Sequence, residues 1–197
     1  MDGIGQIALR VCALLGWLGL AVGFVGRTGA AVGRRPQRAW GSLIGLAIQT
    51  VALAIVWGWR RPIGAPFIPA HVALDWLLVA IAGALAGGAD WLVFRAVRGL
   101  GRQWSLDARV LADHQLVTTG AYAIVRHPIY TGIYALLAVT GFAFSTWGAL
   151  LTAIPVFWLG TNLRVASEER LLRATFGDAY DAYVARVPAV VPRLWAR

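Results

Sequence analysis

The sequence lacks lysine altogether and has only one cysteine and one methionine among its 197 residues. Its 18 basic residues, histidines aside, are therefore all arginines, and they face only nine acidic residues. Because Cys12 is the only cysteine, an intrachain disulfide is excluded. A net charge of +9 would suggest nucleic-acid binding in a soluble protein, so the location of the arginines decides what the charge means.

Charged residues are scarce, at 14%, whereas 59% of the residues are hydrophobic and the mean hydropathy is +0.67. A window of about 20 residues predicts membrane spans at 4–25, 40–59 and 72–97. A fourth apolar block, 129–163, is too long for one crossing and is interrupted by FSTWG at 144–148. We therefore expect an all-α polytopic membrane protein with five transmembrane helices, the last two a hairpin. Four helices is the alternative count.

The arginines cluster in the first loop, the third loop and the tail. The second loop holds only Arg60 and Arg61, and the tip of the hairpin holds none. The positive-inside rule then predicts an external N-terminus and a cytoplasmic tail in a bacterial cytoplasmic membrane. Topology explains the basic charge, so we expect no nucleic-acid partner. No cleavable signal peptide is apparent, because the first span is too long and arginines follow it.

The three spans within residues 1–98 predict a three-helix scaffold. We expect the substrate to enter the protein between these helices. Each span carries a Gly-xxx-Gly pair, a pattern that lets helix backbones approach closely in lipid. A lipid-binding groove is the alternative interpretation. The three pairs are Gly19/Gly23, Gly41/Gly45 and Gly83/Gly87. Three ionisable residues, Arg10, Asp75 and Asp90, fall within spans; placement at the interface is the simpler reading, and substrate contact is the alternative.

The segment GAYAIVRHPIYTG, residues 120–132, marks the return from a polar loop to apolar sequence. Proline suits the first turn of a helix and favours an extended backbone at the residue before it, His127. His127 and Arg126 can therefore point away from the helix that follows. The segment is either a capped helix entrance or a place where these two side chains hold a ligand.

The segment NLRVASEER, residues 162–170, is the second candidate for chemistry. Arg164 and Glu168 are four residues apart and share a helix face, so they form either an ordinary surface pair or part of a site. The tail at 164–187 predicts a cytoplasmic helix, interrupted by Gly177 and ended by Pro188. It is long enough to close over the cytoplasmic ends of the spans.

Several well-known site motifs are missing from the sequence. It contains no GxGxxG after a strand, no P-loop, and no HExxH or CxxC pair. The glycine-rich stretch at 26–33 joins two spans, so it is a weak candidate for a phosphate loop. We expect no metal site, since the three histidines are scattered, at His71, His114 and His127.

Two separated motifs, LVTTGAYAIVRHPIYTG and RVASEERLLRATFGDAYDAYVARVPAVVP, flank the apolar block. In this order and spacing they resemble the isoprenylcysteine carboxyl methyltransferase family of multi-span enzymes. The resemblance covers residues 116–192, about 40% of the chain. It implies that S-adenosylmethionine is the cofactor and that a methyl group passes to a lipophilic acceptor. The acceptor it favours is a carboxylate of the prenylcysteine type.

The resemblance also implies roles for individual residues within 99–197, which would form a cofactor-binding loop, the hairpin and a closing tail. Arg164 matches an arginine at the reacting end and would hold an acceptor carboxylate, with Glu168 as the second catalytic residue. A thiol or amine acceptor would instead need a base, either His127 or a glutamate. The implied cofactor-binding residues are Leu116, Val117, Gly120, Tyr122, His127, Pro128, Tyr130, Gly132, Glu168 and Glu169.

Two departures from the family pattern keep other functions open. The usual Gly-Pro-Tyr is Gly120-Ala121-Tyr122 here, and the usual Arg-Tyr before VRHP is Ala123-Ile124. These changes bear on the acceptor more than on the cofactor. The alternatives are a phospholipid-amine or thiol methyltransferase, an NADPH-dependent membrane reductase of the sterol type, and a non-catalytic membrane module.

Overall fold

A computed structural model describes residues 2–25, 40–62, 65, 67, 72–101 and 115–193. Within these residues the protein is built from helices and contains only one isolated β-bridge. The helices are α1 (Asp2–Phe24), α2 (Trp40–Gly58), α3 (Val72–Leu100), α4 (Ala121–Ile124), α5 (Pro128–Phe144), α6 (Trp147–Phe176) and α7 (Asp178–Arg186). Helices α1, α2, α3 and α6 are long and apolar enough to cross a membrane, and α5 is a shorter apolar helix. The expected all-α polytopic fold is confirmed.

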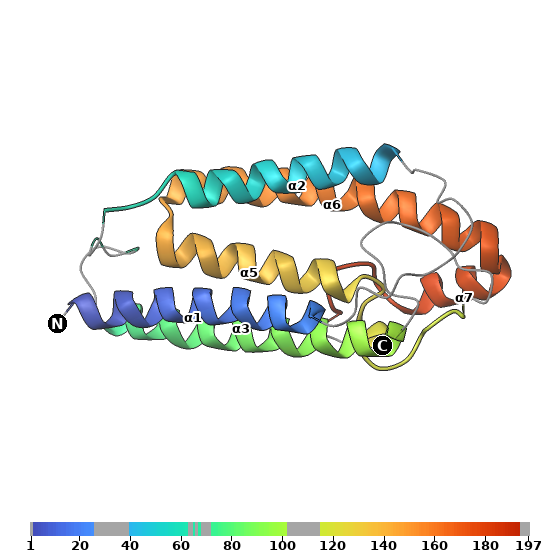
Figure 1. Ribbon diagram of the computed structural model, residues 1–197, viewed down its shortest axis with the longest axis horizontal. Helices are drawn as coiled ribbons and strands as arrows, with labels where there is room; N and C mark the ends of the chain where they lie inside the picture. Colours follow the sequence, from blue (N-terminus) through green and yellow to red (C-terminus); the bar gives the residue numbers. More distant parts are fainter. Residues whose placement is uncertain are drawn as a thin grey trace.

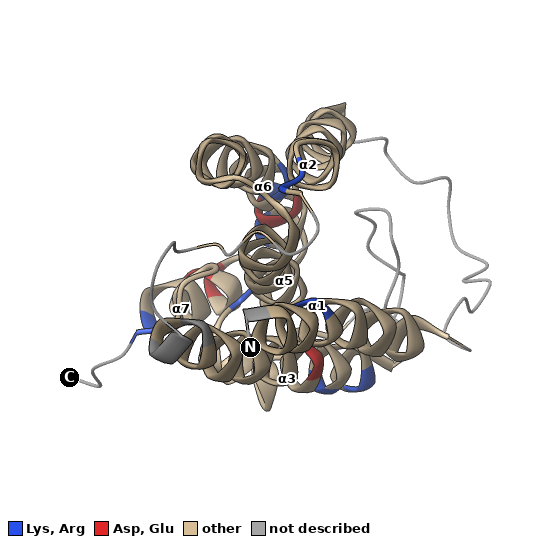
Figure 2. Ribbon diagram, turned by 90° about the vertical axis from the view of Figure 1, so that its left-hand side faces the viewer, with Lys and Arg blue, Asp and Glu red and all other residues tan. Residues whose placement is uncertain are grey.

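The long helices form two pairs with α5 between them (Figure 1). Helix α2 lies along α6 and α1 lies along α3, while α5 contacts all four. The end-on view in Figure 2 shows α5 in the middle of the bundle. Because the helices alternate in direction, the start of α5 and the C-terminal ends of α3 and α6 meet at one end. The candidate site lies at that end.

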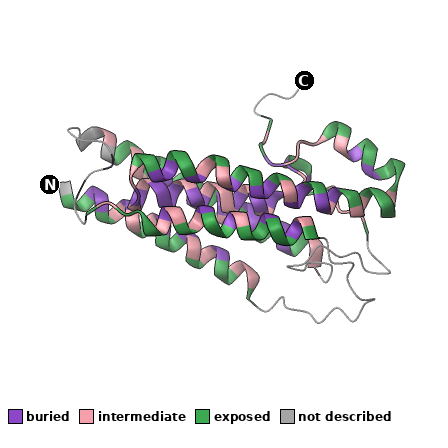
Figure 3. Ribbon diagram, turned by 90° about the horizontal axis from the view of Figure 1, so that it is seen from above, coloured by how far each residue is buried: buried purple, intermediate pink, exposed green. Residues whose placement is uncertain are grey.

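Helix α5 is buried on both sides because neighbouring residues face different pairs. Leu136 packs against the α1–α3 pair, and Leu137 packs against the α2–α6 pair. A Cβ on Gly132 would lie 3.2 Å from the carbonyl oxygen of Ala89, so this glycine lets α5 approach the backbone of α3 closely. Buried residues accordingly concentrate on the inner faces of the bundle (Figure 3).

The corner between α5 and α6 is fixed by polar contacts that the FSTWG interruption supplies. Thr146 caps α6, since its side chain accepts a hydrogen bond from the Ala149 N–H. The Ser145 hydroxyl donates to the Val56 carbonyl of α2. The break in the apolar block is therefore a turn whose hydrogen bonds attach the hairpin to α2. The predicted two-helix hairpin is present.

Two arginines bind the carbonyl end of α5 at this corner. Arg61 Nη2 donates to the carbonyls of Phe142 (2.7 Å) and Ala143 (3.2 Å), and Arg10 Nε reaches the Ala143 carbonyl at 3.5 Å. The last carbonyls of a helix lack intrahelical partners and carry partial negative charge, which cations stabilise. With 17 residues, α5 is about 26 Å long, so its ends need such partners near the membrane boundaries.

The tail does not begin as a separate helix at residue 164. Helix α6 continues without a break from the apolar span to Phe176, so residues 164–176 extend the membrane helix. Gly177 then turns the chain with φ of 52°, a left-handed value that glycine adopts without strain. Only after this turn does α7 fold back toward the bundle (Figure 1). The interruption at Gly177 is where the prediction placed it.

Replacing Arg61 with alanine should destabilise the protein by about 2 kcal/mol, because the carbonyls of Phe142 and Ala143 lose a charged donor. Arg60 provides the matched control, since its Nε bonds only to the local Trp57 carbonyl at the surface. Thermal unfolding in detergent should show a lower midpoint for Arg61→Ala than for Arg60→Ala. Equal midpoints would contradict the capping role.

Candidate functional site

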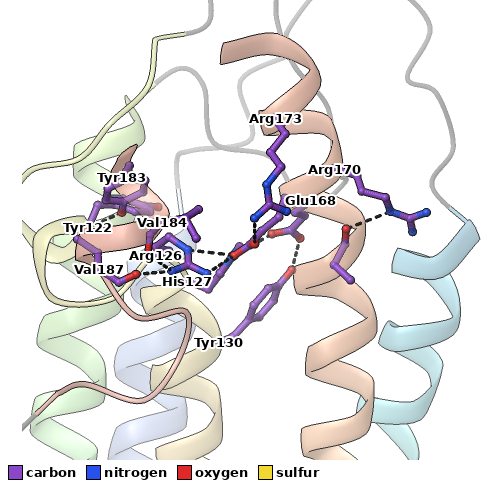
Figure 4. A network of polar contacts seen from close by, with 12 residues as sticks. Tyr122, Arg126, His127, Tyr130, Glu168, Arg170, Arg173, Tyr183, Val184 and Val187 are labelled. Carbon is purple, nitrogen blue, oxygen red and sulfur yellow. Dashed lines mark hydrogen bonds and ion pairs between the residues drawn. The ribbon is translucent and has the colours of Figure 1, made fainter. Parts of the chain in front are cut away.

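Charged and aromatic side chains gather where α5 begins and α6 leaves the apolar span (Figure 4). We call this group the carboxylate cluster. It contains Arg126, His127 and Tyr130 from the start of α5, and Arg164, Glu168 and Glu169 from α6. Glu168 and Glu169 are the only glutamates in the chain.

The start of α5 aims its side chains at α6 because the chain is pinned on its other edge. Pro128 takes the first helical position, and His127 before it has φ of −124°. The backbone N–H groups of Arg126 and His127 donate to the carbonyls of Pro188 (2.8 Å) and Ala189 (2.9 Å) in the tail. The side chains are thereby left free to turn toward the glutamates.

Glu169 is the most heavily paired residue of the cluster. Its Oε1 accepts hydrogen bonds from Arg126 Nη2 (2.7 Å) and Nε (3.0 Å), and it lies 3.3 Å from His127 Nε2. Its Oε2 lies 3.6 Å from Arg173 Nη2, one turn further along α6. Both carboxylate oxygens therefore have cationic partners, and Glu169 joins the start of α5 to α6.

Glu168 sits at the more open side of the cluster. Its Oε2 is 3.4 Å from His127 Nδ1, and its Oε1 accepts a hydrogen bond from the Tyr130 hydroxyl. That hydroxyl in turn accepts from Arg164 Nε at 2.8 Å, and the Arg164 guanidinium lies over the Tyr130 ring. The Glu168 side chain is 23% exposed, against 9% for Glu169. Glu168 is therefore the glutamate that a ligand can reach.

The surroundings of His127 favour its protonated form. Burial lowers the pKa of His127, but hydrogen bonds and charge from Glu168 and Glu169 outweigh burial and raise it above the ordinary 6.5. Each ring nitrogen faces a different glutamate, which suits the doubly protonated imidazolium. With His127 charged, cationic side chains outnumber the carboxylates of the cluster.

A cavity of about 60 Å³ lies next to the cluster, between α7 and the loop before α4. Its walls are mostly aliphatic and aromatic, with Arg126 shared between the cavity and the cluster. The lining residues are Leu100, Gln115, Leu116, Val117, Tyr122, Arg126, Leu172, Tyr180 and Tyr183. The Tyr183 hydroxyl donates to the Tyr122 carbonyl at 2.6 Å and so ties α7 to α4.

The predicted site residues fall into three groups. The carboxylate cluster brings together His127, Tyr130, Arg164, Glu168 and Glu169. The cavity is lined in part by Leu116, Val117 and Tyr122. The remaining three shape the backbone: Gly120 has φ of 64° at the start of α4, Pro128 starts α5, and Gly132 packs on α3 away from the cluster.

Arg126 was proposed from the sequence as a possible ligand-holding residue beside His127, but it was not among the site residues that the family resemblance implied. It makes two hydrogen bonds to Glu169, and its Nη1 also donates to the Val184 carbonyl (3.3 Å) and the Val187 carbonyl. Its position next to His127 was the available signal. What the sequence could not indicate is that one guanidinium joins α5, α6 and the tail.

The ionisable residues within the first three spans lie elsewhere. Arg10 caps the opposite end of α5, and the carboxylate of Asp90 lies against Gly19 of α1. Among the described residues, neither side chain contacts the carboxylate cluster. The side chain of Asp75 and the glycine-rich stretch at 26–33 fall outside the described part of the chain.

The fold and the site define a polytopic membrane protein whose helix ends hold a buried, charge-paired cluster on one side. Residues 81–174 match the sequence profile of the isoprenylcysteine carboxyl methyltransferase family, and this range contains the whole carboxylate cluster and all of the hairpin except the last two residues of α6. The chain belongs to that family. The profile match begins within α3, so α1 and α2 lie outside it.

Three relatives illustrate the range of similarity. Protein-S-isoprenylcysteine O-methyltransferase of Schizosaccharomyces pombe is 38% identical over 41% of this chain and 34% of its own length. Protein-S-isoprenylcysteine O-methyltransferase B of Arabidopsis thaliana is 35% identical over 40% of each chain. Methanethiol S-methyltransferase 2 of Bradyrhizobium diazoefficiens is 31% identical over 82% of this chain and 66% of its own. The chain thus spans only about a third to two thirds of these relatives.

The raised pKa of His127 predicts a pH-dependent contribution to stability. A group whose pKa is higher when folded stabilises the protein fully below its unfolded pKa of 6.5 and loses this effect as pH rises through the folded pKa. The stability difference between the wild-type protein and His127→Gln should therefore shrink on going from about pH 5.5 to about pH 9. Thermal unfolding of both proteins across this range measures it, and the two remaining histidines cancel in the comparison. A constant difference would argue against a charged His127.

Proposed function

We propose that this protein is an S-adenosylmethionine-dependent methyltransferase of the membrane, with its site at the cytoplasmic face. The observation that carries the proposal is the pairing of His127 and Tyr130 with Glu168 and Glu169 in one buried cluster. The two motifs that resemble the methyltransferase family thereby become one site. The arginine-rich segments flank the same end of the bundle, which supports cytoplasmic placement of the site.

The residues present suit the two chemically different ends of S-adenosylmethionine. The cavity offers Tyr122, Tyr180 and Tyr183 among aliphatic neighbours, which suits a flat, aromatic adenine. The Tyr180 side chain is 1% exposed, and its hydroxyl lies near the Arg126 guanidinium without completing a hydrogen bond of good geometry to any described residue. A buried polar atom without a well-formed hydrogen bond is costly, so a ligand that bonds to it would be favoured there.

The open side of Glu168 suits the polar end of the cofactor. Its partly exposed carboxylate can accept hydrogen bonds from ribose hydroxyls or from the ammonium group. Glu169, by contrast, is saturated by Arg126, His127 and Arg173 and would position its neighbours. Glu168 would thus be the binding glutamate and Glu169 the anchoring one.

Arg164 is placed to orient an anionic acceptor. It is 8% exposed and lies over the ring of Tyr130 with its Nε donating to the Tyr130 hydroxyl. The positive charge of this guanidinium would attract a carboxylate or a thiolate brought next to it. The excess of cationic groups in the cluster favours an acceptor that carries negative charge.

When bound, S-adenosylmethionine would supply a methyl group carried on a sulfonium. The acceptor would bond to the methyl carbon in line with the carbon–sulfur bond, and the electron pair of that breaking bond would stay on the departing neutral sulfide. A carboxylate is already ionised near neutral pH, so Arg164 need only hold it in line. This favours a lipophilic carboxylate, such as a prenylcysteine-type group, as the acceptor.

A thiol acceptor is the second candidate, favoured by the relative that aligns over 82% of this chain and is named for methanethiol. A thiol would have to lose its proton before or during transfer. Glu168 is the nearest partly exposed carboxylate that could take it, with Tyr130 between Glu168 and Arg164. The reductase alternative has no support among the relatives described above.

The tail would act as the lid of the cofactor site. A cavity of about 60 Å³ has room for only a few water molecules, so the whole cofactor can enter only if α7 or the loop before α4 moves. Gly177 provides a hinge, while Tyr183 and Arg126 hold the closed position. Burial raises the pKa of Tyr183 to about 12, which keeps its hydroxyl protonated as a donor.

Calorimetry on detergent-purified protein should detect binding of S-adenosylmethionine and of its demethylated product. Glu168→Gln should weaken this binding at least about tenfold, equivalent to about 1.4 kcal/mol, because it removes the negative charge that the ligand's donors meet. Asp178→Asn is the matched control, since it removes an exposed carboxylate in the first turn of α7, and it should bind normally.

NADPH titrated in parallel separates the methyltransferase from a reductase. A folded wild-type protein that binds NADPH and neither form of the methyl donor would contradict the proposal. Equal weakening in Glu168→Gln and Asp178→Asn would contradict the assigned role of Glu168.

A further inference from the structure

The Gly41-xxx-Gly45 pair of α2 lies against α6, and its second glycine touches the candidate site. A Cβ built on Gly45 would lie 2.6 Å from Arg164 Cγ, 3.1 Å from Arg164 N and 2.5 Å from the Gly160 carbonyl oxygen. These distances are too short for a side chain. Gly45 therefore provides the space in which the stem of Arg164 leaves α6.

The same crossing contains a second glycine, Gly160, whose three nearest neighbouring atoms all belong to α2. A Cβ on Gly160 would lie 2.6 Å from the Gly45 carbonyl oxygen and 2.9 Å from both Gln49 Cγ and Gln49 N. Gln49 also donates to the Thr161 hydroxyl at 2.9 Å, which fixes the register of α2 on α6. Gly45 and Gly160 thus bring the same two helices together, but Arg164 is among the three nearest neighbours of an added Cβ only at Gly45.

The direction of the Arg164 side chain depends on this packing. The stem is confined on one side by α2, while its Nε bonds to the Tyr130 hydroxyl of α5 on the other side. Arg164 therefore spans the gap between α2 and α5 with little freedom. Moving the stem by the width of a methyl group would shift the guanidinium relative to Tyr130 and Glu168.

We propose that Gly45 is a positioning residue that sets the placement of the Arg164 guanidinium, and hence the affinity for the anionic acceptor. The proposal rests on the proposed function, in which Arg164 orients that acceptor. It assigns a part in the site to α2, which lies outside the region that matches the family profile. The glycine pair then has a role beyond helix packing.

The test compares Gly45→Ala with Gly160→Ala, alone and combined with Arg164→Ala, in the full-length protein. Methyl transfer from labelled S-adenosylmethionine is measured to N-acetyl-S-farnesylcysteine and to methanethiol, with cofactor affinity measured separately. Gly45→Ala should raise the acceptor KM and lower kcat/KM about tenfold or more, since small misplacements of a binding group are costly. Cofactor affinity should stay within about twofold, and Gly160→Ala should keep kcat/KM within about threefold of the wild type.

The double variants decide whether Gly45 acts through Arg164. On the Arg164→Ala background, Gly45→Ala should cause no further loss of kcat/KM, because the group it displaces is gone. Additive losses, or equal losses from Gly45→Ala and Gly160→Ala, would overturn the positioning role. A wild-type protein that binds no S-adenosylmethionine would overturn the proposed function instead.

Thermal unfolding provides a readout that needs no acceptor. Gly45→Ala should lower the unfolding midpoint less on the Arg164→Ala background than on the wild-type background, because one of the clashing atoms, Arg164 Cγ, is removed. Gly160→Ala should lower it equally on both. If Gly45→Ala lowers it equally on both backgrounds, the proposal fails, whether or not either acceptor is methylated.

Discussion

The site depends on the ion pair between Arg126 and Glu169. Arg126 precedes α5, Glu169 lies in the C-terminal part of α6, and the guanidinium also binds carbonyls of the tail. One buried contact thus fixes three segments that are far apart in the sequence. Removing either partner of such a pair leaves a buried charge uncompensated, at a cost of about 3–5 kcal/mol. His127 adds a second cation to the same carboxylate oxygen, so Glu168 is left to face outward.

Helix α5 shows how a short helix can be satisfied at both ends within a bundle. Its carbonyl end is capped by Arg61 and Arg10, and its amino end begins at Pro128 with the tail bonded to the residues before it. The two sets of arginines have different roles. Those at the hairpin corner stabilise a helix terminus, whereas Arg126 binds the carboxylate of Glu169 and Arg164 binds the phenol of Tyr130 within the cluster. Arginine suits both tasks because its planar donors stay charged when partly buried.

Periodicity and length were sufficient to predict the helices, since long apolar runs have few alternatives in a membrane. The sequence also predicted the break after Phe144, from the polar residues that cap the next helix, and the interruption at Gly177, from the glycine itself. The cluster itself was predicted only through resemblance, because nothing local says that His127 would meet Glu169, 42 residues away. Gly132 illustrates a further limit: its place in a site motif predicted a ligand contact, which stays a prediction, while its close packing on α3 became visible only in the structure. The contacts of Arg126 with the tail depend on how the tail folds back onto the start of α5, a detail that the sequence pattern does not indicate.

The central claim is that the cofactor binds between the carboxylate cluster and the cavity under α7. Hydrogen–deuterium exchange, followed by mass spectrometry with and without S-adenosylhomocysteine, tests it most directly because it locates binding along the chain. The account predicts slower exchange in 115–127 and 178–190, with the outer corner of α5 and α6 unchanged. Protection confined to other segments, or protection of these segments by NADPH alone, would contradict it.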